Sequence, residues 1–202
     1  PLRLVGSEMC IRDRACKVIG LLPTSLEIDG EQYEINSDFR IALLIFEAYA
    51  DKELTYCEKA AVCLNCLYKE VPKNVEEALK KALWFLDGGD VPKSKKAPVK
   101  IIDWSYDESI IFPALNKVAG FETRIASYVH WWTFLGYFSE VGDGLLSQVM
   151  NIRGKRAKGK KLEKWERDFY NEHKELVDIK EKLSPEQQAE LDAEEDFINN
   201  LV

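Results

Sequence analysis

The residues best suited to chemistry are three cysteines that lie close together, Cys57, Cys63 and Cys66. A structural zinc ion needs four ligands, so this single CxxC pair would have to recruit Cys57 and one of the two histidines, His130 or His173. A redox pair is typical of a helix start that follows a strand, whereas Cys63 and Cys66 fall inside a predicted helix. We therefore expect cysteines that pack as small apolar side chains, without a metal or a cofactor.

The chain carries none of the patterns that mark common catalytic sites. It has no GxSxG, HExxH, P-loop or GxGxxG motif, and neither histidine lies near a serine or cysteine in a nucleophile motif. Its many carboxylates follow the pattern of solvated helix faces, with no spacing that pairs two of them as acid and base. We expect a protein without enzyme activity.

A basic run is the sharpest charge feature of the sequence. Residues 153–161 hold six basic and no acidic residues, although the whole chain has a formal net charge of −7. One interpretation is phosphate contact. The other, which we favour, is a solvated connector between two helices or a docking site for an acidic surface such as the chain's own tail. The negative overall charge argues against nucleic acid as the main partner.

An aromatic run at residues 128–138 indicates a buried helix or a binding face. Helical spacing places positions 131, 134, 135 and 138 on one side and positions 132, 136 and 139 on another, so at least one side must be core. The remaining rings either form a second packing layer or present a patch to a partner. Trp131 and Trp132 are expected to point to different sides.

The elements that position these residues are mainly helices. Alternating residues around Asp29 and Gly30 predict a β-hairpin over 26–35. Capping side chains at 36–38, at Thr55 and at Asn74 predict three helix starts. The last helix is predicted to run to Leu86, where residues 87–89 supply a left-handed stop.

Four helices are predicted after residue 100. The first ends near Gly120, and the aromatic helix runs from about 122 to 141. Asp143 is expected to cap the third, and a continuous amphipathic helix follows over 162–179.

The predicted fold is mainly α: an N-terminal β-hairpin is followed by a multi-helix bundle with a C-terminal charged helical extension. The first 14 residues are excluded, because residues 4–14 match a translated sequencing adaptor. The predicted segments are 15–86 with the hairpin and first helices, a linker at 87–100, a helical domain at 101–182 that contains the aromatic helix, and an acidic tail at 183–202.

Composition points to a reduced compartment. Five cysteines are an odd number for a disulfide framework. No apolar run approaches the roughly 20 residues of a membrane-spanning helix, and no signal-peptide pattern is present. We expect a cytoplasmic protein that does not enter a membrane.

The runs His130–Leu135, Ile152–Arg153 and Lys158–Glu166 resemble the gene product 15 family of tailed phages and of prophages in Gram-positive bacteria. The approach segment 103–115 and the hairpin at 28–30 are also similar to that family. The resemblance covers roughly residues 21–179 and carries no established catalytic or ligand residues.

The resemblance implies a tail morphogenesis factor in the host bacterial cytoplasm, acting as a tail assembly chaperone that binds the tape-measure protein. Self-association is left open. The alternatives are a structural head-tail or tail-completion protein of the virion and a small nucleic-acid-binding regulator. The expected partner-binding residues belong to the aromatic helix and the basic run: Trp131, Trp132, Phe134, Tyr137, Phe138, Arg153, Lys155, Arg156 and Lys158.

Overall fold

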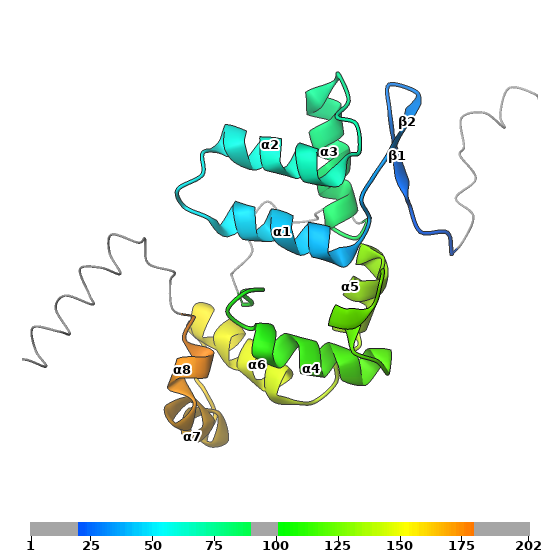
Figure 1. The fold of residues 1–202 in the computed structure, drawn as a ribbon. Coiled ribbons are helices and arrows are strands. Elements are labelled where there is room, and N and C mark those ends of the chain that lie inside the picture. Colours follow the sequence, from blue (N-terminus) through cyan, green and yellow to red (C-terminus); the bar gives the residue numbers. More distant parts are fainter. Residues whose placement is uncertain (1–19, 90–100, 180–202) are drawn as a thin grey trace, which may run out of the picture. The chain divides into compact units, whose positions relative to one another are not determined.

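The computed structural model describes residues 20–89 and 101–179 of the chain, and these are mainly helical after an N-terminal hairpin, as predicted (Figure 1). Contacts between Cα atoms divide the chain into two compact units. The first contains the described parts of Pro1–Lys95 and Thr123–Glu140, and the second those of Lys96–Glu122 and Val141–Val202. The predicted adaptor segment, most of the predicted linker and the acidic tail lie outside the described residues.

The hairpin of the first unit pairs β1 (Ser25–Ile28) with β2 (Glu31–Glu34) in an antiparallel register that places Ile28 opposite Glu31. Asp29 and Gly30 both have positive φ angles, 52° and 84°. Two consecutive positive φ angles are the requirement of a two-residue type I′ turn, which is why the Asp-Gly pair predicts the hairpin correctly.

Three helices of equal length follow the hairpin. They are α1 (Phe39–Ala50), α2 (Tyr56–Leu67) and α3 (Val75–Leu86). Helices α1 and α2 form an antiparallel pair, and α3 contacts both α2 and β1 (Figure 1). Their shared core contains Phe39, Ile45, Cys63, Leu67 and Phe85.

All three predicted helix starts are confirmed. The Asp38 side chain accepts from the backbone N–H of Arg40, and Thr55 forms a reciprocal capping box with Glu58. Asn74 accepts from the third residue of its helix. Each cap satisfies a backbone donor that a helix start would otherwise leave without a partner.

The aromatic helix is shorter than predicted. A 3₁₀ turn (η1, Thr123–Ile125) precedes it, and α5 spans only Trp131–Ser139. Residues before Trp131 are held in an extended conformation, because the backbone N–H of Phe39 donates to the Val129 carbonyl and Trp131 donates to the Ser37 carbonyl. This pairing with the start of α1 replaces the first turns of the expected helix and places α5 in the first unit.

The second unit contains α4 (Glu108–Ala119), α6 (Leu145–Ala157), α7 (Lys164–Glu172) and α8 (Lys174–Val177). Helix α4 ends at Gly120, as predicted, and packs against α6. The N-cap residue of α6 is Gly144 and no side chain caps this helix, so the prediction that Asp143 caps it is wrong. The amphipathic helix predicted over 162–179 is interrupted at His173, where the backbone leaves the helical region. No helix within 20–89 or 101–179 is long and apolar enough to span a membrane.

Candidate partner-binding surfaces

The side chain of His130 caps the N-terminus of the aromatic helix α5. Its Nδ1 accepts from the backbone N–H of Trp132 at 3.0 Å, and its Nε2 lies 2.9 Å from the carbonyl oxygen of Pro23. Because Nδ1 is an acceptor, the ring is neutral and Nε2 carries the proton and donates to Pro23. Burial lowers the pKa of His130 below its ordinary value, which favours this neutral form.

The two tryptophans of α5 both cap the end of α3. The indole N–H of Trp131 donates to the carbonyl oxygen of Leu86 at 2.9 Å, and that of Trp132 donates to the carbonyl oxygen of Phe85 at 2.8 Å. These carbonyls belong to the last turn of a helix, where intrahelical donors run out. Both indole N–H groups therefore reach the same end of α3, while the rings have different neighbours: Trp131 packs on Phe46 and Phe134, and Trp132 packs on Trp84 and Phe85.

The residues that follow α3 fit closely against these rings. Gly88 and Gly89 have φ angles of 76° and 86°, which form the predicted left-handed stop. A Cβ atom on Gly89 would lie 2.8 Å from Cη2 of Trp132. Trp84 also meets Trp132 edge to face, with ring centroids 5.3 Å apart. A larger residue in the turn at Gly89 would therefore collide with the indole ring of Trp132.

The predicted aromatic residues differ in burial. Trp131 and Phe134 are interior, with 1% and 0% of their surface exposed, and Phe134 stacks on Phe39 with centroids 4.4 Å apart. Trp132, Tyr137 and Phe138 are half-buried. Trp131 and Phe134 therefore stabilise the first unit and offer no surface in the folded protein.

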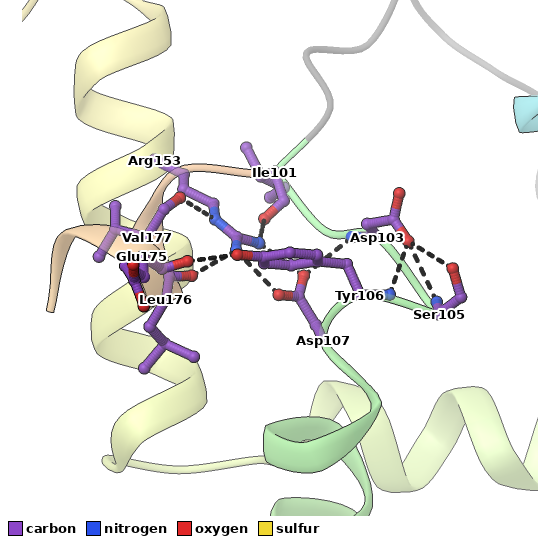
Figure 2. Close-up of polar contacts among 9 residues, drawn as sticks. All are labelled: Ile101, Asp103, Ser105, Tyr106, Asp107, Arg153, Glu175, Leu176 and Val177. Atoms are coloured by element: carbon purple, nitrogen blue, oxygen red, sulfur yellow. Dashed lines mark hydrogen bonds and ion pairs between the residues drawn. The ribbon is translucent and has the colours of Figure 1, made fainter. Parts of the chain in front are cut away.

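Arg153, predicted as a member of a solvated basic run, is a buried residue of α6 in the second unit. Only 6% of it is exposed, and it faces Asp107, which is fully buried. The two guanidinium Nη atoms lie 2.5 and 2.8 Å from the carboxylate oxygens (Figure 2). This bidentate geometry is the strongest form of a charge-assisted hydrogen bond. Burial and this ion pair leave no free charge on Arg153 for phosphate or an external partner.

The same guanidinium also binds three backbone carbonyl oxygens. Nε donates to Val177 at 2.7 Å, and the Nη atoms donate to Ile101 at 3.1 Å and to Leu176 at 2.8 Å (Figure 2). All five N–H donors of the side chain are thereby used. Arg153 therefore links three segments of the second unit: the backbone at Ile101, the start of α4 and the end of α8.

The loop that presents Asp107 is itself ordered by hydrogen bonds. The Asp103 carboxylate accepts from the backbone N–H groups of Ser105 and Tyr106, and the backbone N–H of Asp103 donates to Asp107 (Figure 2). The Tyr106 hydroxyl donates to the carbonyl oxygen of Glu175. These contacts tie residues 103–107 to the α8 region and hold the carboxylate that receives the arginine.

The next basic residues are bound to acids of the same unit. Lys155 lies 2.5 Å from the buried carboxylate of Glu166, which also accepts from Asn151 at 2.9 Å. The pKa of Glu166 is lowered mainly by its hydrogen bond from Lys155. Arg156 pairs with Asp178 and stacks over the Tyr170 ring. The first half of the basic run therefore belongs to a helix and its internal ion pairs.

Lys158 differs from these residues, because it is exposed and lies just beyond α6. Asp107 and Glu166, the acids that are buried within residues 20–89 and 101–179, were not among the predicted site residues. Sequence offers no signal for the Asp107 pairing, since Asp107 precedes its arginine by 46 residues. The capping position of Glu166, three residues after Glu163, is the one local sign that this acid has a structural role.

Within the described residues, the three cysteines all lie in α2 and are free: Cys57 is exposed, Cys66 is intermediate and Cys63 is buried. Burial raises the pKa of the Cys63 thiol, which keeps it protonated and unreactive. Within the described residues, no group of three or more histidine, cysteine or acidic side chains is arranged to hold a metal ion.

Comparison with known proteins identifies one family. The model of the family described as Bacteriophage Gp15 protein matches residues 18–179, a segment that includes the aromatic helix and the whole Arg153 network. No curated protein and no solved structure showed a significant match. Because the match covers most of the chain, this protein belongs to the bacteriophage Gp15 family.

Proposed function

We propose that the protein is a phage tail morphogenesis factor that acts in the host bacterial cytoplasm as a tail assembly chaperone and binds the tape-measure protein. The family match over residues 18–179 carries this proposal, since it supports a role in the structure or morphogenesis of phage particles. Such a role requires a surface for another protein and neither a cofactor nor catalysis.

An apolar stripe on α3 supports a binding role for the first unit. Val75, Leu79 and Leu83 recur every four residues, so they share one face of the helix. Val75 is 50% and Leu83 is 42% exposed, whereas α3 buries its other apolar face in the core. Residues four apart on a rigid helix are the usual anchors for an amphipathic helix, which is the kind of client that this proposal requires.

The predicted partner-binding residues contribute only where they are not interior. Three interior residues are therefore excluded from the candidate partner-binding surface: Trp131, Phe134 and Arg153. The residues that keep accessible surface in their units are Trp132, Tyr137, Phe138, Lys155, Arg156 and Lys158. Of these, Lys155 and Arg156 already bind acids of the same unit, so a partner would meet them as ion pairs rather than as free charges.

Co-purification with the tape-measure protein of the same phage tests the proposal. The wild-type chain is expected to bring down the tape-measure protein, and the V75D/L83D variant is expected to lose it. Leu44 is exposed by 49% on another helix, so L44D is the matched control and should retain binding. Failure of the wild-type pair to co-purify while both proteins are soluble would contradict the proposed function.

A further inference from the structure

The second unit presents an exposed basic surface, formed by Lys158, Lys160, Lys161 and Lys164 with Trp165 at its edge. All four lysines are exposed, and 49% of Trp165 is exposed. Among residues 20–89 and 101–179, no acidic side chain forms an ion pair with any of these lysines. None of the four lysine charges of this basic surface is therefore held in an ion pair by a described acid.

The orientation of α7 explains why Trp165 faces outward. Glu166 is the buried residue of α7, and it points to α6, where Lys155 binds it. A helix turns by about 100° per residue, so the preceding side chain cannot follow it into the interior. The indole N–H of Trp165 instead donates to Glu163 at 2.9 Å, which holds the ring at the edge of the basic surface.

The described chain ends beside this surface. Asp178 pairs with Arg156 in the last turn of α6, and the Tyr170 hydroxyl donates to the same carboxylate at 2.9 Å. Lys158 follows Arg156 by two residues, so residues that continue the chain after Ile179 start next to the basic surface.

The continuing segment, residues 180–202, has the complementary composition. It contains seven acidic and two basic residues in 23 positions. Five of the acids lie between residues 190 and 196, and Phe197 and Ile198 follow them directly. An acidic run with adjacent apolar side chains matches a surface of lysines edged by a tryptophan.

We propose that residues 180–202 fold back onto the basic surface, with the acids of 190–196 against the lysines and an apolar side chain near Trp165. The reach suffices, since the 12 residues from Asp178 to Glu190 span about 18 Å as a helix and about 40 Å when extended. Tethering gives the tail a high effective concentration at this surface, so an external acidic partner must displace it. This inference concerns the isolated chain and does not rest on the proposed function.

Zero-length carbodiimide cross-linking of the full chain tests the contact. The reagent joins a lysine amine to a carboxylate only when the two touch, and mass spectrometry of peptides identifies the pair. We expect links between Lys158–Lys164 and acids of 190–196, with yields that fall at least about two-fold between ~0.1 M and ~1 M salt as the Debye length shrinks from about 10 Å to about 3 Å. Links from the tail spread equally over distant lysines, or no tail links, would overturn the proposal.

A mixture of ¹⁵N-labelled and unlabelled protein identifies the source of the tail. Links within one copy carry a single isotope, whereas links between randomly paired copies in an equal mixture would be mixed as often as unmixed. We expect unmixed links, and mixed links in equal amount to unmixed ones would overturn the intramolecular contact in favour of a second copy. In NMR spectra of the full chain, K160Q/K161Q should shift the amide signals of residues 190–198. The matched variant K73Q/K117Q removes the same charge from exposed lysines elsewhere and should leave them unchanged. Equal shifts from both variants would contradict a specific site.

Discussion

Replacement of Arg153 by lysine should destabilise the second unit despite the conserved charge. The arginine donates five hydrogen bonds, two to Asp107 and three to backbone carbonyls. A lysine ammonium has three donors and no planar fork, so at least two buried acceptors lose their partners. With about 1–3 kcal/mol for each buried group left unsatisfied, the expected loss is roughly 2–6 kcal/mol.

Arg156→Lys is the matched control for this variant. It makes the same chemical change in the same helix, but Arg156 and Asp178 are 42% and 35% exposed at their side chains. An exposed ion pair contributes about 0–1 kcal/mol, so this control should remain close to wild type.

Urea unfolding measures the two free energies, and hydrogen exchange followed by mass spectrometry assigns the loss to a unit. In Arg153→Lys, exchange should accelerate in peptides from 101–122 and 141–179, whereas peptides of α1 and α2 should keep wild-type protection. Equal stability of the two lysine variants would refute the assignment of Arg153 as the organising residue of the second unit.

Two further predictions concern the first unit. Thermal unfolding should show that Gly89→Ala destabilises it more than Gly30→Ala. Both glycines have φ near +85°, where an alanine costs about 1–2 kcal/mol of backbone strain, but only a Cβ at Gly89 also collides with Trp132. The pKa of His130 is lowered in the folded state, so the unfolded chain takes up the proton first: stability is complete above pH 6.5 and declines as pH falls below it. Urea unfolding between pH 7 and 5.5 should show this loss of stability. The variant His130→Asn keeps a capping oxygen but does not titrate, so it should lose less stability over the same pH range. An unchanged dependence of stability on pH in this variant would contradict the role of His130.

The features that sequence predicts correctly depend on residues a few positions apart. Asp29 and Gly30 specify their turn through their own φ angles, and Thr55 forms its capping box with Glu58 three residues later. Such contacts form within one turn of the chain, so residue type and spacing identify them.

The features that sequence misses depend on contacts between distant segments. The aromatic run is strongly helical in pattern, but backbone pairing with the start of α1 delays the helix to Trp131. The basic run looks solvated, but Asp107 draws Arg153 into the interior. In the first case a long-range contact decides where the helix begins, and in the second it decides whether a side chain is buried. A pattern of residue types along the chain does not identify the partner in such a contact.

We propose that this protein assists tail assembly without becoming part of the particle. Quantitative mass spectrometry of tape-measure-containing assembly intermediates and of purified particles from the same producing cells tests it directly. We expect the protein in the intermediates, bound to the tape-measure protein, and its absence from finished particles. A fixed number of copies in every purified particle would contradict the chaperone assignment and identify a structural component of the virion.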